Sequence, residues 1–165
     1  MPEPESRLFP PSGGIPNNPF LPLLIYRRAL PADAAAAETH INANGWECRW
    51  RNGIFPYHHF HSTAHEALAV VQGEARVRLG GEAGEDFSIE AGDVVVLPAG
   101  TGHKCLEASG DFLIVGAYPP GQEYDIEKPD EALIDRKLAA IAKVPLPGAD
   151  PVGGANGALM RLWRG

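Results

Sequence analysis

Cysteine is scarce in this sequence. Cys48 and Cys105 are the two present among 165 residues, and they lack CxxC spacing. Two thiols are too few for a disulfide framework, so we expect a reducing compartment, the cytoplasm. Long apolar runs are also lacking, and the start MPEPESRLFPP has neither the basic nor the apolar region of a signal peptide. The sequence therefore predicts no membrane partner.

Positive charge is in short supply as well. Lys and Arg total 14 against 21 Asp and Glu, which gives a formal net charge of -7 at pH 7. A surface with this balance repels phosphate backbones. We therefore expect no nucleic-acid partner. The hydrophobic share of 44% is nevertheless ordinary for a globular protein.

The length suits a single domain with terminal extensions. Residues 1–45 are interpreted as an arm rich in Pro, Gly and Asn, a strand within LPLLIYRRAL, and a short helix over 31–44 that ends at Gly45. We assign residues 46–120 to a barrel. A C-terminal helix and tail, residues 121–165, complete the same domain.

A period of two runs through the central part of the chain. Trp46, Cys48 and Trp50 share one face of WECRWRN, and Asn52 followed by Gly53 predicts a hairpin turn. Further strands are expected at FPYHHFH, EALAVVQ, EARVRL, DFSIE, DVVVLP, HKCLE and DFLIVGAY. This cadence, followed by an amphipathic helix in KPDEALIDRKLAAIAKV, predicts an all-β fold with peripheral helices.

Histidines are concentrated in residues 53–73, GIFPYHHFHSTAHEALAVVQG. Alternate side chains share one face of a strand, so His59 and His61 point together and His58 points away. Glu66 begins the next strand with an inward phase. Two imidazoles and a carboxylate can therefore enter one cavity.

A second cluster, GDVVVLPAGTGHKCLE, ends in a strand on which His103, Cys105 and Glu107 share one face. A third imidazole can thus join the first two. Glu107 and Tyr57 have the inward phase and are candidates for catalytic proton transfer, although both could be structural polar groups. Cys105 is either a thiol beside the cavity or a small buried hydrophobe, and we favour the second.

These two clusters resemble the motifs of the cupins. The first motif, G-x5-H-x-H-x4-E-x6-G, is matched at Gly53, His59, His61, Glu66 and Gly73. The second, G-x5-P-x-G-x2-H-x3-N, is matched at Gly92, Pro98, Gly100 and His103, with Glu107 in place of the usual asparagine. The arm GGIPNNPFLPLLIY and the stretch NGWECRWRNGIF also look like those of small, uncharacterised bacterial cupins.

The resemblance implies a double-stranded β-helix of jelly-roll type, and a metal ion bound by His59, His61, Glu66 and His103. Three imidazoles and a carboxylate suit one divalent transition metal ion, Fe, Mn, Ni, Cu or Zn, and affinity alone does not select among these. The alternative is that the four residues remain from a site that has lost its metal. Strand phase and a bend argue against His58 and His65 as ligands.

Among cupins this ligand set is associated with dioxygenases, isomerases, decarboxylases and oxalate-degrading enzymes. We expect a metal-dependent, dioxygenase-like oxidoreductase acting on a small oxygenated molecule. The alternatives are an isomerase or decarboxylase, and a non-enzymatic cupin that binds or senses a small ligand or a metal. Strand phase also predicts that no lysine or arginine enters the cavity, so that Arg49 and Arg51 point outward.

Cupins commonly pair through their barrel faces. The arm and the tail, which ends in the apolar pair Leu162 and Trp163, offer extensions that two chains can exchange. We therefore expect a homodimer.

Overall fold

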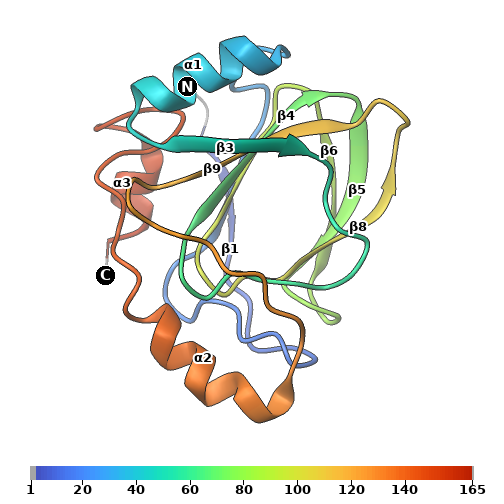
Figure 1. The fold of residues 1–165 in the computed structure, drawn as a ribbon, viewed down its shortest axis with the longest axis vertical. Coiled ribbons are helices and arrows are strands. Elements are labelled where there is room, and N and C mark those ends of the chain that lie inside the picture. Colours follow the sequence, from blue (N-terminus) through green and yellow to red (C-terminus); the bar gives the residue numbers. More distant parts are fainter. Residues whose placement is uncertain (1–2, 165) are drawn as a thin grey trace.

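The computed structural model describes residues 3–164, so the first two positions of the predicted arm and the last of the tail lie outside the described residues. Residues 3–164 form a six-stranded and a three-stranded antiparallel sheet (Figure 1). In spatial order, the larger sheet contains β1 (Glu5–Arg7), β2 (Leu23–Tyr26), β7 (Val94–Leu97), β4 (Glu66–Gln72), β9 (Leu113–Tyr118) and β3 (Glu47–Asn52). The smaller sheet contains β6 (Glu85–Glu90), β5 (Glu74–Leu79) and β8 (His103–Ala108). The predicted β-rich class is confirmed.

Short helices flank the sheets, namely α1 (Ala34–Ala43), the 3-10 helix η1 (Glu131–Leu133), α2 (Ile134–Ile141) and α3 (Ala158–Leu162). In α1 the Asp33 carboxylate accepts a hydrogen bond from the backbone N–H of Ala36 at 2.8 Å and so caps the first turn. Gly45 follows the helix with a φ of 89°. Figure 1 shows α1 along β3 and α2 at the opposite end of the molecule. Within residues 3–164, no helix has the length and apolar character that a bilayer crossing requires.

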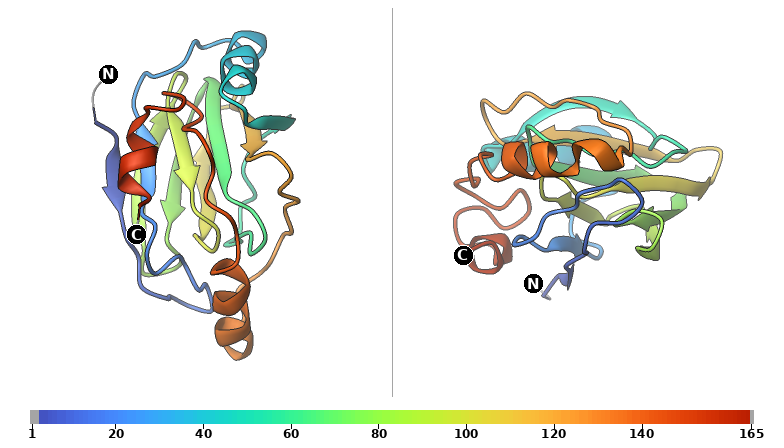
Figure 2. Two further views of the ribbon diagram at one scale, coloured as in Figure 1. Left: turned by 90° about the vertical axis from the view of Figure 1, so that its left-hand side faces the viewer. Right: turned by 90° about the horizontal axis from the view of Figure 1, so that it is seen from below.

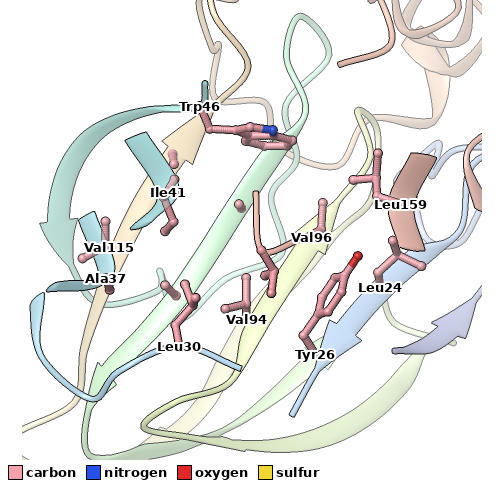
Figure 3. Close-up of a cluster of buried hydrophobic side chains, with 14 of the residues drawn as sticks. Leu24, Tyr26, Leu30, Ala37, Ile41, Trp46, Val94, Val96, Val115 and Leu159 are labelled. Atoms are coloured by element: carbon pink, nitrogen blue, oxygen red, sulfur yellow. The ribbon is translucent and has the colours of Figure 1, made fainter. Parts of the chain in front are cut away.

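The central strands of the larger sheet, β2, β7, β4 and β9, are buried on both faces. One face packs against α1, α3 and the loops around them, through residues that include Leu24, Tyr26, Ile41, Val94, Val96 and Leu159 (Figure 3). The other face packs against the smaller sheet, through residues that include Leu23, Leu68, Val77, Phe87, Val95 and Ile114. Successive side chains on a strand point to opposite faces, so a strand between two apolar layers needs apolar residues at consecutive positions. This explains the uninterrupted apolar runs of β2, β4 and β7.

The C-terminal tail packs on this sheet within the same chain. Trp163 is buried, and its indole N–H donates to the carbonyl of Pro22 at 2.8 Å. The buried Asp150 carboxylate accepts hydrogen bonds from the Tyr26 hydroxyl and from the backbone N–H groups of Val152, Gly153 and Leu159. Figure 2 shows α3 beside β1 in both views. Residues 150–163 therefore cover the outer face of β2.

The predicted hairpin at Asn52 and Gly53 is wrong. Strand β3 pairs instead with β9, where Trp50 lies opposite Gly116. A Cβ atom at position 116 would lie 2.2 Å from Cε2 of Trp50, so glycine is what allows the indole to cross β9. In the described chain, the expected strand FPYHHFH is reduced to bridges at His59 and Phe60.

The glycines of the two motifs differ in structural importance. Gly100 has a φ of 96°, and a Cβ atom there would lie 2.7 Å from the carbonyl oxygen of Asn17. We expect Gly100→Ala to lower the free energy of unfolding by about 2 kcal/mol or more, because it combines left-handed backbone strain with overlap. Gly53→Ala is the matched control, since an added Cβ there meets nothing within 4 Å. Urea denaturation compares the variants, and similar losses would contradict this account.

Candidate metal centre

His59 and His103 face each other across an antiparallel bridge. The backbone N–H of His59 donates to the carbonyl of His103 at 3.2 Å, and the reverse bond is 3.0 Å long. Direct pairing places the two side chains on the same face, and their ring centroids are 3.9 Å apart. His61 follows on the same side, with its ring centroid 5.3 Å from that of His103.

Glu66, at the start of β4, completes the cluster. Its Oε1 lies 3.1 Å from Nε2 of His61 and 3.3 Å from Nε2 of His103. One ring nitrogen from each of His59, His61 and His103 lies within 4.8 Å of the others, so the three histidines could hold a metal ion. All four side chains are buried. The structure thus brings together the four residues that the sequence predicts as ligands.

The segment that follows β9 holds His61 in place. The Nδ1–H of His61 donates to the backbone carbonyl of Asp125. The Asp125 side chain in turn accepts hydrogen bonds from the backbone N–H and hydroxyl of Ser62 and, at 3.3 Å, from the backbone N–H of Thr63. Burial opposes ionisation of Asp125, but these hydrogen bonds outweigh it and lower its pKa. The carboxylate therefore fastens the two segments together.

Each histidine of the cluster has a fixed tautomer. Nδ1 of His59 bonds to the carbonyl of Tyr57 at 3.0 Å, and Nδ1 of His103 bonds to the carbonyl of Thr101 at 3.1 Å. Because a carbonyl is an acceptor only, each Nδ1 carries the proton, and a neutral ring directs its Nε2 lone pair into the cluster. Within the described chain, Nε2 of His61 and Oε1 of Glu66 have no hydrogen-bond partner. Two acceptors this close need a cation between them, either a proton or a metal ion.

The electrostatics of the cluster agree with this requirement. Burial opposes protonation of His61, but the Glu66 carboxylate beside it raises the pKa of His61 to about 9. Burial likewise opposes ionisation of Glu66, but His61 and His103 outweigh it and lower the pKa of that carboxyl. Burial and the neighbouring His103 lower the pKa of His59 to about 3. The His61–Glu66 pair therefore shares a proton, which a bound metal ion would displace.

Two residues outside the predicted ligand set, Tyr118 and Trp50, hold Glu66 in place. The Tyr118 hydroxyl donates to Oε2 of Glu66 at 2.5 Å and accepts from the indole N–H of Trp50 at 2.8 Å. Burial and the Glu66 charge raise the pKa of Tyr118, so the phenol keeps its proton. This bond engages Oε2 and leaves Oε1 for the histidines. Strand phase could have found Tyr118, because it shares the inward face of β9 with Ile114 and Gly116.

The cluster lies in the wall of a cavity of about 330 Å³. Around the ligands, the lining includes Trp50, Asn52, Ile54, Phe55, Leu68, Tyr118, Tyr124 and Ile126. Among the described residues, no lysine or arginine lines this cavity. Arg49 instead pairs with Glu123 at 3.0 Å, and Arg51 pairs with Glu38 at 2.7 Å. The predicted absence of cationic side chains is confirmed for residues 3–164.

The inward orientation predicted for Glu107 is wrong. Pairing between β5 and β8 shifts at a bulge, where Val77 lies opposite Cys105 and Arg76 lies opposite Glu107. One extra residue in β8 reverses the alternation of side chains beyond it. The Glu107 side chain is consequently 75% exposed and pairs with Arg76 at 3.2 Å. It cannot exchange protons with a ligand in the cavity.

Tyr57 lies beside the cavity mouth rather than inside it. Its ring stacks on Phe55, with centroids 5.1 Å apart, and its centroid lies 5.7 Å from that of His59. Tyr57 is 37% exposed and is not among the lining residues.

The remaining candidates have structural partners. His58 pairs with Glu82 at 2.8 Å, and Nδ1 of the buried His65 accepts a hydrogen bond from the backbone N–H of Ala99 at 2.9 Å. Neither belongs to the cluster, as predicted. Cys105 packs against the apolar layer between the sheets, as expected for a small hydrophobe, but it is partly rather than fully buried.

Comparison with known proteins supports the motif analysis. Residues 47–115 match the model of the cupin domain. The chain is 41% identical over 163 residues to the uncharacterised protein YjlB of Bacillus subtilis, and the match covers 98% of this chain and 97% of that protein.

Solved structures with a similar fold share less sequence. Procruciferin, the 11S globulin of Brassica napus, is 20% identical with a TM-score of 0.40, and the match covers 47% of this chain and 21% of that one. A deletion mutant of oxalate decarboxylase from Bacillus subtilis is 20% identical with a TM-score of 0.37, and the match covers 69% and 29%. The chain thus spans less than a third of either structure.

The bond from Tyr118 to Glu66 generates a testable prediction. Tyr118→Phe should lower the affinity for a divalent metal about tenfold, because Oε2 of Glu66 loses the donor that orients it. Tyr124→Phe is the matched control. Its ring stacks on that of Tyr118 with centroids 4.4 Å apart and an interplanar angle of 10°, yet no hydrogen bond links its hydroxyl to Glu66 in the described chain. Calorimetric zinc titration measures both, and equal affinities would refute the orienting role.

Proposed function

The chain belongs to the cupin family, and we propose that it is a metal-dependent, dioxygenase-like oxidoreductase acting on a small oxygenated organic molecule. One divalent transition metal ion would be held by His59, His61, Glu66 and His103. The observation that carries the proposal is the convergence of four buried donor groups in the wall of a cavity. On this proposal the two sheets are the halves of a double-stranded β-helix barrel.

The donor set fits Fe, Mn, Ni, Cu or Zn. When bound, such an ion acts as a Lewis acid on an enol, diol or keto acid, and a redox-active ion also activates O2. The chain itself orients the ligands through the carbonyls that hold each Nδ1 and through the phenol that holds Glu66. The Tyr118 hydroxyl is engaged by Glu66 and Trp50. Tyr57 does not line the cavity, but its ring lies 5.7 Å from that of His59, and we propose it for proton exchange with a bound molecule that extends to the mouth.

A non-enzymatic cupin that binds or senses a small ligand is the second candidate. It is favoured by the orientation of Glu107, which removes one expected proton carrier from the cavity. Beyond the proposed ligands, the polar groups on side chains that line the cavity in the described chain are Asn52, the hydroxyls of Tyr118 and Tyr124, and the indole N–H of Trp50, which is bonded to Tyr118. Few groups are thus available for acid–base chemistry.

We expect about one metal ion per chain in protein purified anaerobically without added metal. The double variant His59→Ala/His61→Ala should lose this ion, because it removes two imidazole ligands. His58→Ala, which alters the adjacent residue that pairs with Glu82, should retain it. Elemental analysis measures all three, and absence of metal from the unaltered protein would refute the metal site.

Metal-loaded protein then distinguishes the functional candidates. Oxygen uptake with a diketone, catechol or thiol that depends on His59 and His61 supports the dioxygenase-like proposal. Turnover without oxygen uptake indicates an isomerase or decarboxylase instead. Tight ligand binding without turnover favours the binding protein.

We also propose a homodimer located in the cytoplasm, with neither nucleic acid nor membrane as partner. Strand β1 pairs with β2, and the indole of Trp163 bonds to the carbonyl of Pro22. The arm and the tail are the extensions that we propose two chains exchange. Size-exclusion chromatography with light scattering should give twice the chain mass. A monomer mass at micromolar concentration would refute the dimer.

A further inference from the structure

We propose that the cavity takes a molecule with a flat apolar ring beside its metal-chelating oxygens, and that it disfavours compact dianions such as oxalate. This inference rests on the proposed metal site. It concerns the walls that surround the ligands rather than the ligands themselves.

The chemistry of the cavity walls favours an apolar ligand. Away from the four proposed ligands, the lining is mainly aromatic and aliphatic, with Trp50, Ile54, Phe55, Pro56, Leu68, Tyr124 and Ile126. Contact between this surface and an apolar group of a ligand lowers the free energy, because apolar area on both is removed from water. This surface offers little to a small polar molecule beyond the ion.

The net charge of the metal-loaded site sets the ligand charge that it can neutralise. A divalent ion and the single carboxylate of Glu66 leave one net positive charge. Among the described residues, no lysine or arginine lines the cavity, and Arg49 and Arg51 are paired outside it. A monoanionic chelator would therefore balance the site, whereas a dianion would leave an uncompensated charge in an apolar cavity.

Aromatic rings lie close to two of the proposed ligands. Tyr118 and Tyr124 stack on each other, and their ring centroids lie 6.2 Å and 5.6 Å from that of His61. Phe55 lies against His59, with centroids 5.1 Å apart and an interplanar angle of 72°. Ring faces and edges near two of the proposed ligands favour stacked or edge-to-face contact with a planar ligand. The cavity of about 330 Å³ is at the small end for ligand sites, which suits a single ring.

Some of the apolar side chains that line the cavity are exposed to solvent. Phe55 is 42% exposed and Ile126 is 49% exposed. Both lie on segments that border the proposed ligands, and a ring bound at the ion would cover them. Exposed apolar groups that border a cavity are a common sign of a ligand surface.

Two hydroxamates test this proposal in zinc-loaded protein, because they share a chelating group and differ in the ring. Benzohydroxamate should bind about tenfold more tightly than acetohydroxamate by calorimetry, and oxalate should bind more weakly than benzohydroxamate. Phe55→Ala and Ile126→Ala should each weaken benzohydroxamate about threefold or more and leave acetohydroxamate within about twofold. Phe20→Ala is the matched control, since Phe20 is 79% exposed and does not line the cavity.

Zinc stoichiometry, measured on the same samples, separates the two levels of the argument. Equal affinities for the two hydroxamates, or tighter binding of oxalate, would overturn the ring preference while the metal site stands. Unaltered protein that retains no zinc would overturn the metal site and this inference with it.

Discussion

The lone pairs of three imidazoles and the charge of one carboxylate are directed at the same buried region, and they repel one another unless a cation lies between them. Backbone carbonyls impose this arrangement, because each accepts a hydrogen bond from the Nδ1–H of one histidine. The rest of the fold offsets the repulsion among these four groups, because it holds them in place on different segments. His59 and His103 are paired through their backbones, and Glu66 begins a strand that is buried on both faces.

The support extends outward from the cluster. Glu66 is held by Tyr118, Tyr118 accepts from Trp50, and Trp50 has room because position 116 lacks a side chain. The orientation of one carboxylate oxygen thus depends on the pairing of β3 with β9. On the other side, His61 depends on Asp125, whose neighbours Tyr124 and Ile126 form part of the cavity wall. The groups that orient the ligands and the groups that shape the cavity therefore belong to the same segments.

Local patterns predicted β4 to β9 well, because alternation and turn residues are contained within short stretches of chain. Strand phase, which is local, indicated that His59, His61, Glu66 and His103 point inward, whereas their convergence on one metal ion was expected from the resemblance of the two motifs to the cupins. The partner of β3 was not predictable, because it lies more than sixty residues away. The orientation predicted for Glu107 was wrong because one inserted residue reverses the alternation of side chains along β8, and a single sequence gives little sign of a bulge. Tyr118 was missed because its importance arises from contacts with Trp50 and Glu66, which are distant in sequence.

The tail has a consequence for the order in which the molecule is assembled. Leu24 and Tyr26 are covered by residues 150–163, and 124 positions separate Tyr26 from Asp150. During translation the outer face of β2 stays exposed to water or to chaperones until residues 150–163 have been synthesised and have left the ribosome. A chain interrupted before Asp150 would leave the Tyr26 hydroxyl without its carboxylate and Leu24 without its cover. Emergence of residues 150–163, rather than completion of the central strands, then marks the point at which this fold can close.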